Sequence, residues 1–177
     1  MKKQSLMIRL AAYPEVDSIS NGPGLRTVLW TQGCPHNCPG CHNPDTHHMN
    51  GGRLVSPEWI IQRIPHYQRG ITFSGGDPMC QASSLIPIAK WAHSIGMDVW
   101  CYTGYRYETL LKSPTHRAFL DHIDVLVDGP YVRSLPSAPW RGSNNQRIID
   151  VKKSKGGEIV LWMKDQVKAF PLKESAE

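Results

Sequence analysis

Long apolar segments are missing from this chain of 177 residues. No stretch approaches the roughly 20 apolar residues that a membrane-spanning helix needs. No apolar signal core follows the basic N-terminus at residues 1–5. No internal repeat or low-complexity segment stands out either. We therefore expect a cytoplasmic protein that folds as a single domain over residues 1–177, with its core at about 13–151 and a C-terminal tail at about 163–177.

An even set of well-spread cysteines is also lacking. The chain has five cysteines, and three of them fall within eight residues. A disulfide scaffold usually has an even count and needs an oxidising compartment. Clustered cysteines in a cytosolic chain favour metal or redox chemistry instead. The two isolated ones, Cys80 and Cys101, are predicted to be small buried apolar side chains.

The net positive charge is modest, and the basic residues that produce it form no dense cluster. The net charge is +5, from 20 basic and 15 acidic residues. A basic balance can indicate nucleic acid or an acidic partner surface. The basic residues are scattered, however, and the densest run is at 152–155 near the C-terminus. A solvated tail is the favoured interpretation, so we expect no nucleic-acid partner and no membrane partner.

Apolar runs typical of strands alternate with helical patterns along the chain. Such alternation implies β-α units and an α/β fold with a largely parallel sheet, whose active site lies at the carboxyl ends of the strands. A complete eight-unit barrel needs about 250 residues, so we expect a partial, open barrel. The predicted strands are 26–31, 70–74, 97–102, 123–127, 147–151 and 158–162, and helices are predicted from 56, at 81–94 and from 107.

The three clustered cysteines, Cys34, Cys38 and Cys41, have the spacing C-x3-C-x2-C, and no fourth cysteine follows nearby. Four-iron clusters normally take four cysteine ligands. Three cysteines therefore suggest a cluster with one iron left open, and an open metal position usually marks a reactive site. A structural zinc site is the alternative, in which His42, His47 or His48 completes a Cys3His set.

A second motif, Gly75-Gly76-Asp77, follows the predicted strand at 70–74. Its glycines permit unusual backbone angles and the close approach of a ligand. The Asp77 carboxylate can accept hydrogen bonds from a ligand ammonium group. Glycine and aspartate are also ordinary turn residues, so alone the motif fits a plain turn.

Together, the two motifs resemble the radical S-adenosylmethionine superfamily. The resemblance implies that the cysteines hold a [4Fe-4S] cluster and that the amino and carboxylate groups of S-adenosylmethionine bind the fourth iron. It departs from the superfamily in Gly40, where many members have an aromatic residue, and in Asp77, where glutamate is commoner. The residues that it implies for the S-adenosylmethionine site are Gly40, Cys41, His42, Gly75, Gly76 and Asp77.

Further motifs resemble one group within that superfamily, the activases of anaerobic (class III) ribonucleoside-triphosphate reductases. These motifs are residues 103–105, 127–129 and 140–146, whereas residues 21–26 resemble the entry motif of glycyl-radical-enzyme activases in general. The resemblance covers about 13–151. It implies reductive cleavage of S-adenosylmethionine and removal of hydrogen from a glycine of the large reductase subunit, which becomes a glycyl radical. It also implies a low-potential flavodoxin or ferredoxin as electron donor.

Alternatives remain at this point. The chain can be the activase of another glycyl radical enzyme, such as pyruvate formate-lyase, or a non-catalytic zinc-binding module. Residues 140–146 are either a partner-facing loop or a plain surface loop. Arg26 either contacts substrate or forms a structural salt bridge.

Overall fold

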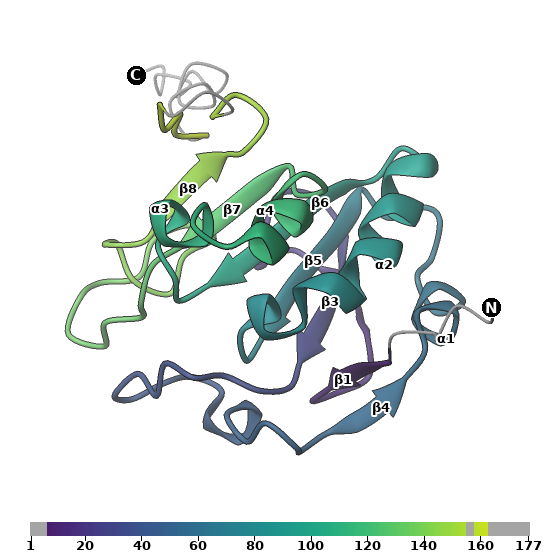
Figure 1. The fold of residues 1–177 in the computed structure, drawn as a ribbon, viewed down its shortest axis with the longest axis horizontal. Helices are drawn as coiled ribbons and strands as arrows, with labels where there is room; N and C mark the ends of the chain where they lie inside the picture. The colour runs from purple at the N-terminus through teal and green to yellow at the C-terminus, as the bar shows by residue number, and fades with distance from the viewer. Residues whose placement is uncertain (1–6, 155–157, 163–177) are drawn as a thin grey trace, which may run out of the picture.

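The computed structural model describes residues 7–154 and 158–162. One mixed, eight-stranded sheet forms its centre, in the order β4-β1-β3-β5-β6-β7-β8, with β2 also paired to β3. The helices lie over one face of this sheet, as Figure 1 shows. The α/β class and the open sheet are therefore confirmed. The predicted C-terminal tail at 163–177 falls outside the described residues.

Four parallel strands make the middle of the sheet and follow one another in chain order. Their carboxyl ends therefore share one edge, where the registers pair Thr31 with Gly75 and Thr103 with Asp128. Each begins and ends within two residues of its predicted bounds. The strands are β3 (Arg26–Thr31), β5 (Gly70–Gly75), β6 (Asp98–Thr103) and β7 (Val125–Asp128).

Short antiparallel strands flank this centre, so the sheet is mixed where a largely parallel one was predicted. The sequence did not reveal the three N-terminal ones, and the predicted strand at 158–162 amounts to a single bridge between Ile149 and Leu161. The flanking strands are β1 (Ile8–Leu10), β2 (Glu15–Ser18), β4 (Arg53–Val55) and β8 (Arg147–Asp150).

The helices are short, and local capping explains where they start. Ser56 accepts a hydrogen bond from the backbone N–H of Trp59 and so begins α1, as predicted. Pro87 lies inside α2 without ending it. No described helix is both long and apolar enough to cross a membrane. The helices are α1 (Pro57–Ile61), α2 (Ala82–Ser94), α3 (Tyr107–Leu110) and α4 (Pro114–Leu120), with 3-10 turns η1 (Pro44–Thr46) and η2 (Pro78–Gln81).

The two faces of the sheet contribute side chains to different apolar clusters, because side chains alternate along each strand. Ile71, Phe73 and Cys101 join the large core beneath the helices. Trp100 and Val127 point to the other face and belong to a smaller apolar cluster, against which Trp140 and Trp162 pack. This second face is the one that the helices leave uncovered.

Candidate functional site

A cavity of about 700 Å³ lies at the carboxyl edge of the parallel strands. All three clustered cysteines line it, and so do Gly75 and Gly76. Residues at the ends of β6 and β7, among them Thr103 and Gly129, complete this part of the wall. The structure thus brings the cysteine motif and the glycine turn to one site at the predicted edge.

The cysteine-bearing segment, residues 34–41, is called the cluster loop below. Its start is fixed by backbone hydrogen bonds from Gly33 N to Thr46 O (2.8 Å) and from Cys34 N to His47 O (3.2 Å). The three thiols are partly buried and form no disulfide. Burial is the main cause that raises the pKa of the Cys34 thiol. Three such thiols around one cavity fit the ligand set of an iron–sulfur cluster.

His42, one candidate for the fourth ligand of a zinc site, packs its ring against Tyr131, at 4.4 Å between the ring centroids. Among residues 7–154 and 158–162, no three His, Cys, Asp or Glu side chains are arranged to hold a metal ion, and the three cluster-loop cysteines are included in that finding. The arrangement of these side chains therefore does not separate a zinc site from an iron–sulfur site.

The glycine turn fits closely against the start of the cluster loop. Gly75 has a φ of 103°, a conformation that glycine adopts without strain. A Cβ atom on Gly76 would lie 2.3 Å from the carbonyl oxygen of Gly33, and one on Gly75 would lie 2.5 Å from the backbone of Thr31. Both positions need glycine because this turn lies backbone to backbone against the end of β3 and against Gly33, the residue before the cluster loop.

Asp77 is fully buried and is not one of the residues that line the cavity. Its carboxylate accepts hydrogen bonds from Met79 N (2.9 Å), Thr103 Oγ1 (2.9 Å) and Gly104 N (3.1 Å). It also contacts His36 Nε2 at 2.5 Å. The predicted contact of Asp77 with the ammonium group of S-adenosylmethionine stays a prediction.

Gly40 is the second predicted site residue, after Asp77, that lies outside the cavity wall. It is exposed and does not line the cavity. A Cβ atom there would lie 2.4 Å from Cδ of Arg133, so this side chain occupies the space that a larger residue would need. Cys41 and His42, by contrast, both line the cavity.

Sequence reasoning missed most of the loop at 129–146, which follows β7 and also lines the cavity. Tyr131, Trp140 and Arg141 contribute to the wall, and of this loop only Gly129 and the segment from 140 onward had been singled out. The loop is held in place by hydrogen bonds from Tyr102 Oη to Trp140 O (2.8 Å) and from Gln146 Nε2 to Gly129 O (2.9 Å). The rule that sites gather beyond strand ends would have selected Tyr131, two residues after Gly129.

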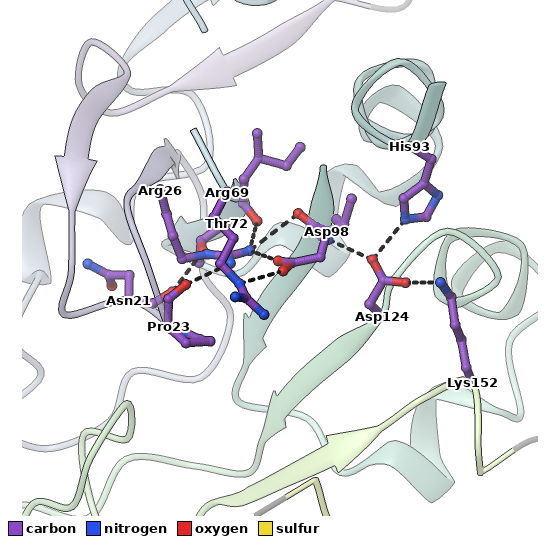
Figure 2. A network of polar contacts seen from close by, with 11 residues as sticks. Asn21, Pro23, Arg26, Arg69, Thr72, His93, Asp98, Asp124 and Lys152 are labelled. Carbon is purple, nitrogen blue, oxygen red and sulfur yellow. Dashed lines mark hydrogen bonds and ion pairs between the residues drawn. The ribbon is translucent and has the colours of Figure 1, made fainter. Parts of the chain in front are cut away.

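Arg26 lies at the opposite edge of the sheet from the cysteines, because it begins β3. Figure 2 shows it between Pro23, Thr72 and Asp98. Its Nε donates to Thr72 Oγ1 (2.8 Å), and its Nη2 lies 2.5 Å from the Asp98 carboxylate. Of the two roles considered for Arg26, the structure supports the structural salt bridge.

The isolated cysteines have different surroundings. Cys101 is completely buried in the core beneath the helices, as predicted. Cys80 is exposed, so the prediction of a buried side chain is wrong there. The reason is that Cys80 lies in the 3-10 turn η2, whose buried side chains are Pro78 and Met79.

Comparison with known proteins agrees with this site. Residues 20–149 match the family described as a 4Fe-4S single cluster domain, which makes the chain an iron–sulfur protein with one four-iron cluster. The anaerobic ribonucleoside-triphosphate reductase-activating protein of Escherichia coli (strain K12) is 39% identical over 149 residues, 77% of this chain and 94% of the relative. That of phage T4 is 36% identical over 138 residues, 72% of this chain and 85% of the relative. The chain belongs to the family of anaerobic ribonucleoside-triphosphate reductase-activating proteins.

These matches confirm the predicted family, the enzyme class and the cofactor pair, a [4Fe-4S] cluster and S-adenosylmethionine. The crystal structure of QueE from Escherichia coli is also similar, with a TM-score of 0.45 and 18% identity, over 55% of this chain and 52% of that chain. The individual cluster ligands and the contacts to S-adenosylmethionine stay predictions.

Proposed function

We propose that this protein generates the glycyl radical of an anaerobic ribonucleoside-triphosphate reductase by removing a hydrogen atom from a glycine of the large subunit. The observation that carries the proposal is the shared cavity, where three thiols and the Gly75-Gly76 turn meet at the carboxyl edge of the sheet. Relatives that bear the reductase-activating name cover most of the chain, which favours this partner over pyruvate formate-lyase.

The residues that line the cavity would have different roles. The sulfur atoms of Cys34, Cys38 and Cys41 would hold three irons of the cluster. The backbone of Gly75 and Gly76 would face the amino-acid end of S-adenosylmethionine at the fourth iron, because no side chain screens it. When bound, the two cofactors supply the one-electron chemistry that the protein's own side chains lack.

His42 and Tyr131 would receive the adenine ring. Their own rings are in contact, and both line the cavity. Aromatic rings stack favourably on one another, so a ring of this tilted pair provides the apolar face that Gly40 cannot. The role that many superfamily members assign to a residue before the third cysteine would thus pass to Tyr131.

A macromolecular substrate needs an accessible cavity, and the exposed rim of this cavity gives that access. Ile19, which is 70% exposed, and Pro139, which is also exposed, lie at the rim on segments far apart in sequence. The glycine-bearing segment of the reductase would enter between them. We also propose a low-potential flavodoxin or ferredoxin as electron donor and a cytoplasmic location, both on the strength of the family resemblance.

The test is to mix the reduced, cluster-loaded protein with S-adenosylmethionine and the reductase, and to record an electron paramagnetic resonance spectrum. A glycyl radical doublet on the reductase is expected. Pyruvate formate-lyase serves as the parallel substrate and should give no doublet. If the reductase gives none while the cluster is intact and S-adenosylmethionine is cleaved, this partner is rejected.

A further inference from the structure

A histidine inside the cluster loop is tied to the glycine turn. His36 stands between Cys34 and Cys38, and its Nε2 lies 2.5 Å from Oδ2 of Asp77. The side chains are 17% and 1% exposed, respectively, so little water competes with this contact. The ring of His36 also packs edge-on against Tyr105, at 4.4 Å between the ring centroids. The loop that carries the thiols is thereby fastened to the end of β5 and to the segment after β6.

The carboxylate of Asp77 has no capacity left for a further donor. An ionised carboxylate offers about four lone-pair sites. Four donors already surround it: Met79 N, Thr103 Oγ1, Gly104 N and His36 Nε2. An ammonium group could bind there only by displacing one of these donors, and the carboxylate does not line the cavity.

The backbone around the pair is shaped to admit the histidine ring. A Cβ atom on Gly104 would lie 2.5 Å from Cδ2 of His36, so any larger residue at this position would collide with the ring. Aspartate at position 77 is one methylene shorter than the commoner glutamate, and the structure gives a physical reason for this difference. The shorter side chain keeps the carboxylate beneath the cluster loop, where Thr103 and Gly104 hold it.

We propose that Asp77 is a positioning residue that holds the cluster loop against the sheet through His36, and that it does not bind S-adenosylmethionine directly. The inference rests on the proposed function in one respect only, namely that the three thiols of the loop hold the cluster. It assigns His36 a place in the cluster site that the cysteine spacing does not indicate. It also predicts that His36 and Asp77 act as one unit.

The test compares variants of the anaerobically reconstituted holoprotein by two measurements without the reductase: the rate of iron release to a chelator, and the dissociation constant for S-adenosylmethionine. His36→Phe keeps a ring against Tyr105 but removes the nitrogen, whereas His36→Gln keeps a hydrogen-bond donor. We expect His36→Phe and Asp77→Asn each to speed iron release by about tenfold, since each breaks a charge-assisted hydrogen bond. The double variant should be no faster than either single one. His36→Gln should recover most of the wild-type rate.

Asp128→Asn is the matched control for general loosening. Asp128 is also a fully buried carboxylate at a strand end, but its partners are Tyr107 N and Arg147. This variant should lower the free energy of unfolding and leave iron release within about twofold of wild type. Release as fast as in Asp77→Asn would overturn the proposal.

A direct contact between Asp77 and the cofactor predicts a different pattern. Asp77→Asn would then weaken binding of S-adenosylmethionine, while His36→Phe would match wild type in both measurements, and this result would also overturn the proposal. If Asp77→Asn does not fold, equal release rates in His36→Phe and His36→Gln overturn it. Failure of the proposed function is detected by a separate measurement, the electron paramagnetic resonance spectrum of the reductase, in which the glycyl doublet would be missing.

Discussion

Arg26 holds its positive charge without any exposed surface, which is costly unless its donors are satisfied. Thr72 Oγ1, the carbonyl of Ile71 and the Asp98 carboxylate accept its hydrogen bonds, and the guanidinium lies over the ring of Trp100 at 5.5 Å. Burial lowers the pKa of this guanidinium, and Asp98 opposes that effect. The side chain therefore joins β3, β5 and β6 at the amino-terminal edge of the parallel strands.

Replacing Arg26 should cost far more stability than replacing Arg69, which pairs with the same Asp98 but is 57% exposed. Arg26→Met removes one partner of a buried pair, and we expect a loss of about 3 kcal/mol in the free energy of unfolding. Arg69→Met should cost less than about 1 kcal/mol because water screens the exposed pair. Urea unfolding measures both. Similar losses of unfolding free energy in the two variants would show that burial of the arginine does not determine the strength of its ion pair with Asp98.

Glu108 makes stability depend on pH in the acid range. Arg147 donates two hydrogen bonds to its carboxylate, at 2.9 and 2.8 Å, and these lower the pKa of Glu108 to about 2. A carboxyl group whose folded pKa is lowered contributes stability that is complete above its unfolded pKa and is lost as the pH falls toward the folded one. The contribution of Glu108 should therefore disappear between about pH 4.5 and pH 2.

The variant Glu108→Gln isolates this effect. Because Glu108 is more than half exposed, its loss should cost only about 0.5–1 kcal/mol at pH 7. Wild type should lose more stability than the variant between pH 5 and pH 2.5, so that the two thermal unfolding curves converge in acid. Parallel losses in the two proteins would contradict the assignment.

Single residues also show where sequence reasoning ends. The cysteine spacing and the glycine turn were sufficient to locate the cavity, because both motifs are local in the chain. Nothing in the local sequence links Asp77 to His36, since the pair is 41 positions apart and meets only when β5 lies beside the cluster loop. Cys80 was misjudged for a similar reason, because the orientation of a short turn depends on its packing.

Among the elements, the central strands were predictable and the flanking ones were not. The centre combines apolar runs of four to six residues with helical segments between them, a pattern that is clear in the sequence. Strands β1, β2 and β4 have only three or four residues, and most of β2 is exposed, so hydrophobic periodicity is too brief to reveal them. Their pairing with a neighbour, rather than their own composition, makes them strands.

The conformation of the loop at 129–146 should depend on the hydroxyl group of Tyr102. Tyr102→Phe removes the hydrogen bond to the carbonyl of Trp140, a residue with the unusual φ of 55°. Since one hydrogen bond contributes about 1 kcal/mol, amide exchange at 137–142 should become roughly five times faster. Hydrogen-exchange mass spectrometry measures this rate, and amides of β8 serve as the internal control. Equal acceleration in β8 would mean that the whole domain, not the loop, has been loosened.

At the scale of the whole molecule, the cluster should stabilise the folded state through one loop. Its three thiols come from residues 34–41, and a ligand that binds the folded state alone stabilises it. We expect anaerobic removal of iron to lower the midpoint of thermal unfolding by about 5 °C, corresponding to about 2 kcal/mol. Calorimetry on the loaded and chelator-treated protein measures the difference.

Two variants control this measurement. Cys38→Ala should lose its iron and unfold at the same temperature with or without chelator. Cys101→Ala should keep its iron, because that thiol is buried in the core away from the cavity, and should only lower both midpoints together. Equal iron loss in the two variants would contradict the ligand assignment.

Different residues anchor the two loops that border the cavity, and the loops touch where Tyr131 packs against His42. Asp77 and His36 fasten the cluster loop to β5 and β6, whereas Tyr102 and Gln146 fasten the loop at 129–146 to β6 and β7, and Figure 1 shows the ribbons of both loops at the same end of the sheet. The iron site and the choice of partner can thus diverge separately during evolution. Exchanging residues 134–145 with those of a related activase, with Tyr131 and Arg133 kept, should transfer the choice of partner while the iron site is inherited unchanged.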